Sequence, residues 1–160
     1  QVVGKELVRL AASEHILDGF SHQGNCVPAS HAPWDSVDPH AQRLLERGIK
    51  GIIAFDIAVV KTEGGPRFPA IECNPRFNGA SYPTLIAGKL GIPEWSAVTL
   101  KTSSRSLSDI DLSGLEFDGS TGRGVVLVNW GTVLAGKLVA LLAGPREVQE
   151  TLAIELRSRL

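Results

Sequence analysis

The sequence predicts an α+β fold in which an antiparallel sheet carries flanking helices. Strand-like and helix-like segments are mixed along the chain without the regular alternation that a doubly wound parallel sheet requires. In addition, the apolar segments Gly51–Val60 and Arg67–Asn74 are joined by a short glycine-rich turn, which is the usual signal of an antiparallel hairpin. With 160 residues, the chain is long enough to bury one substantial core.

The first third of the chain predicts little regular structure before one helix. Two short apolar runs, Leu7–Ala12 and His15–Leu17, are strand-like. Residues 21–34 are rich in Gly, Asn, Pro, Ser and His, so we expect a loop there. A helix should begin at Ser36 and stop at the next glycine, because apolar residues recur at helical spacing between a capping serine and that glycine.

After the hairpin, the pattern predicts a second helix and most of the sheet. The helix should open at Ser81-Tyr82-Pro83 and end at Gly91. Residues 102–123 are polar and rich in glycine and serine, which predicts a long loop. Three further strands and a terminal helix with one apolar stripe complete the expected fold. The strands are Trp95–Lys101, Gly124–Trp130 and Lys137–Ala143, and the stripe consists of Val148, Leu152 and Leu156.

The composition argues against several classes of partner and location. With 16 basic and 17 acidic residues, the chain lacks the positive surface that nucleic acid or an anionic membrane would bind, so we expect neither partner. No apolar run approaches the roughly 20 residues that cross a bilayer. Two cysteines make no disulfide framework, which favours a cytoplasmic location. The chain starts at Gln1 and contains no methionine, as expected for a part excised from a longer protein.

The predicted hairpin places two acidic side chains on one face. Because side chains alternate along a strand, Asp56 lies among small residues, away from the bulky apolar set. If the turn is symmetric about Gly64, Asp56 lies directly opposite Glu72, with Cβ atoms about 5 Å apart. Such a pair attracts a hard cation with oxygen ligands, and Mg²⁺ is usually held by one or two carboxylates and substrate phosphates. The second strand should place Phe68, Ala70, Glu72 and Asn74 on one face, so Asp56, Glu72 and Asn74 form the expected metal site.

The segment after the second strand adds groups that bind anions. Arg76 comes just beyond the carboxylates and offers a bidentate fork for phosphate or carboxylate. The backbone from Gly79 to Ser81 then leads into a predicted helix N-terminus, which is itself an anion-binding position. A phosphate-bound Mg²⁺ would therefore fit at this end of the hairpin.

The run Glu72-Cys73-Asn74-Pro75-Arg76-Phe77-Asn78-Gly79 resembles the metal-binding strand and loop of the ATP-grasp superfamily. The family pattern is Glu, any residue, Asn, Pro, Arg and then a turn of small residues. The strand that contains Asp56 is similar to the family's upstream acidic strand, and the likeness covers residues 48–92. It implies that residues 1–160 are the C-terminal, metal-binding subdomain of an ATP-grasp fold.

The resemblance implies part of an ATP-dependent ligase that joins a carboxylate to an amine or thiol through an acyl-phosphate. Glu72 and Asn74 would bind Mg²⁺ or Mn²⁺, and Asp56 would share that ion or bind a second one. Arg76 would be the catalytic residue that steadies the transferred phosphate, and the ATP-binding set would be Arg76, Asn78, Gly79 and Ser81. The implied partners are ATP, a small-molecule or peptide carboxylate, an amine or thiol acceptor, and the N-terminal half of the same enzyme.

Departures from the family pattern keep other functions open. The family's ATP-binding lysines lie upstream of this segment, but only Lys5 and Lys50 precede the acidic strand here, so we expect the isolated chain to be inactive. The alternatives are a non-catalytic nucleotide- or metal-binding module and an assembly module that forms a homo-oligomer through an exposed sheet edge. The carboxylates could also simply lie on a solvated sheet face. In the expected loop, His22, Gln23 and Asn25 are candidate contacts to the acceptor.

Overall fold

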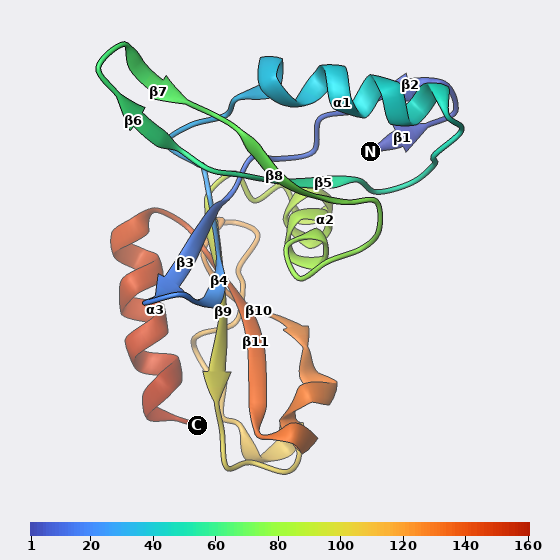
Figure 1. The fold of residues 1–160 in the computed structure, drawn as a ribbon. Helices are drawn as coiled ribbons and strands as arrows, with labels where there is room; N and C mark the ends of the chain where they lie inside the picture. Colours follow the sequence, from blue (N-terminus) through green and yellow to red (C-terminus); the bar gives the residue numbers. More distant parts are fainter. The chain divides into compact units, whose positions relative to one another are not determined.

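A computed structural model describes all residues from 1 to 160 (Figure 1). The chain divides into two compact units, each built from two segments. Unit 1 consists of Gln1–Leu10 and His31–Ser81, and unit 2 consists of Ala11–Ser30 and Tyr82–Leu160. Helices occur together with antiparallel sheets, which confirms the predicted α+β class. None of the helices is both long enough and apolar enough to span a lipid bilayer.

Unit 1 contains one helix and three two-stranded antiparallel pairs. The helix α1 covers Trp34–Glu46. The pairs are β1 (Val2–Val3) with β2 (Glu6–Leu7), β5 (Ala54–Ile57) with β8 (Ala70–Asn74), and β6 (Val60–Thr62) with β7 (Gly65–Arg67). Helix α1 lies beside β5, where the rings of His40 and Phe55 have centroids 6.3 Å apart. The predicted hairpin therefore exists, but it consists of two short strand pairs in series.

Helix α1 begins two residues before the predicted Ser36. The carbonyl of Pro33 accepts the Ser36 N–H at 3.0 Å, so the first turn closes on the backbone and does not need the serine hydroxyl as a cap. The predicted stop is correct: the helix ends before Gly48, which takes a positive φ of 83°. Glycine adopts this left-handed conformation without the steric cost that other residues incur.

Unit 2 contains a five-stranded antiparallel sheet with the strand order β10-β11-β9-β4-β3 (Figure 1). The strands are β3 (Glu14–Asp18), β4 (Ser21–Val27), β9 (Trp95–Lys101), β10 (Gly124–Asn129) and β11 (Lys137–Ala143). The helices are α3 (Arg146–Ser158) and, except for its first residue, α2 (Ser81–Leu90), with 3₁₀ turns η1 (Leu107–Asp109) and η2 (Trp130–Ala135). Strands β9 and β11 and the end of α2 before Gly91 agree with the prediction.

The sheet of unit 2 is covered on both faces. Alternate residues of β11 pack to opposite sides, as side chains along any strand do. Leu138 and Leu142 join a buried cluster with Leu156 of α3, whereas Leu141 joins a second cluster with Ala87 of α2. Full burial of each such leucine contributes about 2 kcal/mol relative to exposure. The predicted apolar stripe of the terminal helix is thus core packing.

Two expectations for the N-terminal third are wrong. The expected loop over residues 21–34 begins instead with β4, which lies between β3 and β9. Position 24 of this strand needs a glycine, because the backbones of β4 and β9 approach closely there. A Cβ would lie 1.9 Å from the carbonyl oxygen of Ala97. The apolar run Leu7–Ala12 is strand only at Leu7, the last residue of β2.

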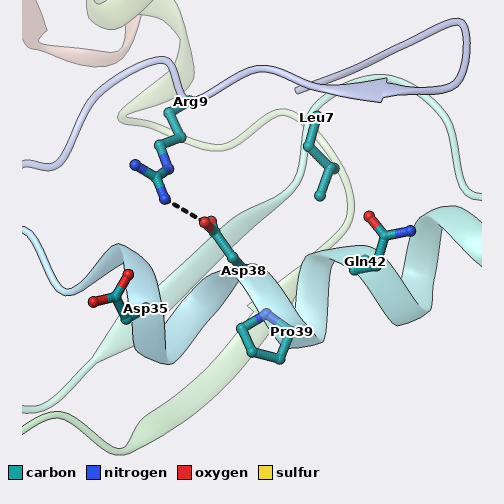
Figure 2. A pocket seen from close by; sticks show the side chains of 6 residues that line it. All are labelled: Leu7, Arg9, Asp35, Asp38, Pro39 and Gln42. Carbon is teal, nitrogen blue, oxygen red and sulfur yellow. Dashed lines mark hydrogen bonds and ion pairs between the residues drawn. The ribbon is translucent and has the colours of Figure 1, made fainter.

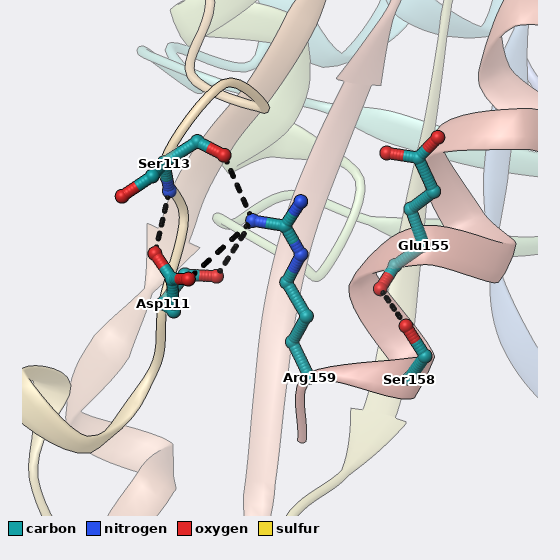
Figure 3. A network of polar contacts seen from close by, with 5 residues as sticks. All are labelled: Asp111, Ser113, Glu155, Ser158 and Arg159. Carbon is teal, nitrogen blue, oxygen red and sulfur yellow. Dashed lines mark hydrogen bonds and ion pairs between the residues drawn. The ribbon is translucent and has the colours of Figure 1, made fainter.

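The expected long loop over residues 102–123 is mostly irregular, but the C-terminus holds it in place. The guanidinium of Arg159 donates to the carbonyls of Asp111 at 3.2 Å and Ser113 at 2.9 Å (Figure 3). Thr102 donates its hydroxyl to the carbonyl of Leu160 at 3.2 Å. The loop is therefore part of the folded unit even though its composition is that of a flexible segment.

Candidate metal and phosphate site

Asp56 lies directly opposite Glu72 in the antiparallel pair of β5 and β8, as predicted. Ala54 lies opposite Asn74 in the same pair. Directly opposed residues share a sheet face and have Cβ atoms about 5 Å apart. Asp56, Glu72 and Asn74 are therefore brought together on one face of unit 1.

The predicted pairing of Asp56 with Glu72 is correct, although the predicted position of the hairpin turn is wrong. The hairpin turn is centred between Glu63 and Gly64, because Thr62 pairs with Gly65. Continued without interruption, this register would place Ile71 opposite Asp56. A β-bulge intervenes: Ile57 pairs with Ala70 and Asp56 pairs with Glu72, which leaves Ile71 as the extra residue of β8. Such bulges re-aim side chains next to functional sites.

The bulge corrects one expectation about the second strand. Because Ala70 pairs with Ile57, it lies on the face opposite to Asp56 and Glu72, so it does not share a face with Glu72 and Asn74 as predicted. The bulge interrupts the two-residue period that the prediction assumed.

The three candidate ligands differ in exposure. Glu72 is exposed and Asp56 is partly buried, whereas Asn74 is only 7% exposed. The acidic pair is thus open to solvent on the Glu72 side, and the amide of Asn74 lies at its buried end.

Arg76 lies in a tight turn directly after β8. Its backbone N–H donates to the carbonyl of Asn74 at 2.8 Å, and its guanidinium donates to the carbonyl of Phe77 at 3.1 Å. The side chain is exposed, and a guanidinium has five N–H donors. The position therefore leaves donors for a phosphate while the turn restricts where the guanidinium can lie.

The predicted ATP-binding residues Asn78 and Ser81 bond to each other. The side-chain oxygen of Asn78 accepts the Ser81 N–H at 3.0 Å and the Ser81 hydroxyl at 2.8 Å. In return, the Asn78 N–H donates to the Ser81 hydroxyl oxygen at 3.1 Å. This reciprocal arrangement is a capping box at the start of α2. It fixes the loop around Gly79, where no heavy atom lies within 4 Å of a Cβ position.

The donor set suits a hard cation. Carboxylate and amide oxygens are ligands for Mg²⁺ and Mn²⁺, whereas zinc prefers sulfur and imidazole. No group of three or more His, Cys, Asp or Glu side chains suited to hold a metal occurs among residues 1–160. The residues present therefore fit Mg²⁺ only if water and phosphate oxygens complete the six positions that it prefers.

The residues proposed as acceptor contacts, His22, Gln23 and Asn25, belong to unit 2, where His22 and Asn25 join a network that includes Ser13. His22 Nε2 lies 3.0 Å from the side-chain oxygen of Asn25, whose amide nitrogen donates to the Ser13 hydroxyl at 3.1 Å. The rings of His22 and His15 have centroids 4.9 Å apart. A strand prediction over residues 21–27 would have indicated this network, because His15 then pairs with Asn25.

Unit 1 also has a hollow of about 520 Å³ between α1 and the segment after β2 (Figure 2). Arg9 donates to Asp38 at its edge and lies over the Trp34 ring at 5.4 Å from the centroid. Two of the charged groups at the hollow thus pair with each other. The other residues that line it are Leu7, Asp35, Pro39 and Gln42.

Comparison with known proteins finds no matching family model, curated protein or solved structure. The function is therefore inferred from the pairing of Asp56 with Glu72 and from the chemistry of the residues that follow β8.

Proposed function

We propose that Asp56, Glu72 and Asn74 bind Mg²⁺ or Mn²⁺ at the phosphate end of an ATP site. The enzyme would be an ATP-dependent ligase of the ATP-grasp type that joins a carboxylate to an amine or thiol, and residues 1–160 would be its C-terminal, metal-binding subdomain. The observation that supports this most is the cross-strand pair of Asp56 and Glu72 with Asn74 on the same face.

The electrostatics of the pair favour a bound cation. Two carboxylates on directly opposed residues of one sheet face repel each other, and more strongly at a protein surface than in bulk water. A divalent ion converts this repulsion into attraction, and the bound ion would neutralise phosphate charge during transfer. The exposed side of the pair, at Glu72, leaves room for the phosphate oxygens.

The loop after β8 would hold the phosphates. Arg76 would donate N–H groups to the transferred phosphate in a charge-assisted, bidentate contact. The bonds between Asn78 and Ser81 would keep the backbone at Gly79 in place, so that its N–H can face an anion at the start of α2. These residues contribute positioning and charge neutralisation, and neither role requires a covalent step.

The test is Mn²⁺ binding measured by electron paramagnetic resonance, with and without ATP. We expect millimolar affinity for the chain alone and at least fivefold tighter binding when ATP is present, because phosphate oxygens join the ligand shell. Glu72→Gln and Asp56→Asn should each weaken binding at least fivefold. The matched control is Glu63→Gln, which changes an exposed acid at the hairpin turn, outside the pair.

Two outcomes would argue against this function. Equal Mn²⁺ affinity in Glu72→Gln and the wild type would remove the metal site. Binding that depends on Glu72 but is insensitive to ATP would favour a metal-binding module without a nucleotide.

A further inference from the structure

Two of the four histidines meet on neighbouring strands of unit 2, His15 on β3 and His22 on β4. Their ring centroids lie 4.9 Å apart and the rings are edge to face at 83°. We propose that His15 and His22 form a site for a borderline transition cation such as Cu²⁺, Ni²⁺ or Zn²⁺. This site shares no residue with the Asp56–Glu72 pair and does not depend on the function proposed for it.

A β-bulge brings the two imidazoles to the same face. His15 pairs with Asn25 and Ile16 with Gly24, but Leu17 pairs with His22, so Gln23 is the extra residue of β4. In an unbroken strand, His22 would lie on the face opposite to Asn25, three residues away. The bulge moves it onto the face that Asn25 and His15 share, where it can contact both.

Asn25 orients the His22 ring as ligand-supporting residues do. With the Asn25 amide nitrogen directed at Ser13, its oxygen lies 3.0 Å from His22 Nε2, and in this arrangement Nε2 carries the hydrogen. Nδ1 is then the nitrogen with a lone pair for a cation. Asn25 is 3% exposed, and its amide nitrogen donates to the Ser13 hydroxyl at 3.1 Å. Metal-binding histidines nearly always donate their other ring N–H to an oxygen acceptor.

The spacing of the rings fits one shared ion. Two imidazoles that bind one tetrahedral ion at about 2.0–2.1 Å have ring centroids roughly 5 Å apart, close to the 4.9 Å observed. Each histidine would supply one ring nitrogen to the ion. Both side chains are exposed. Because no third His, Cys, Asp or Glu completes the group, water or an outside ligand fills the other positions.

Imidazole ligands also decide which cation binds. Affinity for such nitrogen sites rises along the first-row metals to Cu²⁺, whereas Mg²⁺ prefers oxygen. Mg²⁺ would therefore bind at Asp56–Glu72 and not at His15–His22.

The four histidines provide their own controls. We would titrate Ni²⁺ by calorimetry into untagged wild-type protein and into His15→Ala, His22→Ala, His31→Ala and His40→Ala. The first two variants should each lose at least tenfold in affinity. The last two should stay within twofold, because their rings lie in unit 1 against Phe68 and Phe55. Glu63→Gln, which changes an exposed acid outside both sites, should bind Ni²⁺ as the wild type does.

A spectroscopic readout separates ligation from a change in fold. With Cu²⁺, electron paramagnetic resonance should show coupling to two imidazole nitrogens in the wild type and to one in either single variant. Circular dichroism should be unchanged, since both side chains are exposed. Equal Ni²⁺ affinities in His22→Ala and His31→Ala, or an unchanged Cu²⁺ spectrum in His22→Ala, would overturn the proposal.

Discussion

Asp56 and Glu72 face each other because one extra residue, Ile71, interrupts the register between the turn of the hairpin and the β5–β8 pair. The same device operates in unit 2, where the extra residue Gln23 places His22 on the face of Asn25. In both cases a bulge decides which polar side chains meet. A pattern that assumes strict alternation cannot locate such a bulge.

Deletion of Ile71 should leave the acidic pair intact. Without the extra residue, Ala70 still pairs with Ile57 and Glu72 with Asp56, now in a continuous ladder. We therefore expect the Mn²⁺ affinity of the deletion variant to stay within about threefold of the wild type. Electron paramagnetic resonance measures the affinity, and circular dichroism checks the fold.

The control deletion removes Cys73. It keeps Glu72 opposite Asp56 but places Asn74 opposite Phe55, on the other face. If Asn74 is a ligand, this variant should bind Mn²⁺ several-fold more weakly than the Ile71 deletion. Equal binding by the two variants would show that Asn74 contributes nothing to the site.

The sequence predicts those elements best whose pattern is enforced by the core. Strands β9 and β11 have the predicted bounds because both of their faces are covered, so their apolar residues run without interruption. The pairing of Asp56 with Glu72 was also predictable, although the prediction placed the turn half a residue away and did not include the bulge that compensates. The shift in the turn position and the bulge at Ile71 cancel each other, so the predicted pair is still correct.

Strand β4 could not be recognised from its own residues. Its polar side chains and Gly24 have the composition of a loop, and only the neighbouring strands β3 and β9 make it a strand. The network of Ser13, His22 and Asn25 was missed for the same reason, since its members meet only across the β3–β4 pair.

Gly24→Ala should be strongly destabilising. A Cβ at this position would lie 1.9 Å from the carbonyl oxygen of Ala97, so β4 and β9 would have to separate. We expect the free energy of unfolding to fall by about 3 kcal/mol or more in urea denaturation. Gly88→Ala is the contrasting variant, because Gly88 lies within α2 with no heavy atom within 4 Å. It should stabilise by about 0.5–1 kcal/mol, and a loss there as large as at Gly24 would contradict the steric argument.

Arg159→Ala should release the loop of residues 102–123. The guanidinium donates to the carbonyls of Asp111 and Ser113 and is partly buried, so its loss should cost about 1–2 kcal/mol in urea denaturation. The control is Arg146→Ala, which removes an exposed pair with Glu150 and should cost under about 0.5 kcal/mol. Amide hydrogen exchange should also become faster in the loop of the Arg159 variant alone. Unchanged exchange there would mean that the C-terminus does not hold the loop.

The acid stability of the chain should depend on Ser120. Hydrogen bonds from the Ser120 hydroxyl and backbone N–H lower the pKa of Asp118 below its usual value. The folded state then binds fewer protons than the unfolded state between the two pKa values. Stability from this group is therefore complete above the unfolded pKa of about 3.9 and is lost as the pH falls through the folded pKa.

Thermal unfolding between about pH 2 and pH 6 should show a smaller fall in melting temperature toward low pH in Ser120→Ala than in the wild type. In Ser158→Ala, whose hydroxyl donates to the backbone carbonyl of Glu155 and to no carboxylate, the decline should match the wild type (Figure 3). If Ser120→Ala keeps the wild-type pH slope, the bonds to Asp118 do not link protonation to folding.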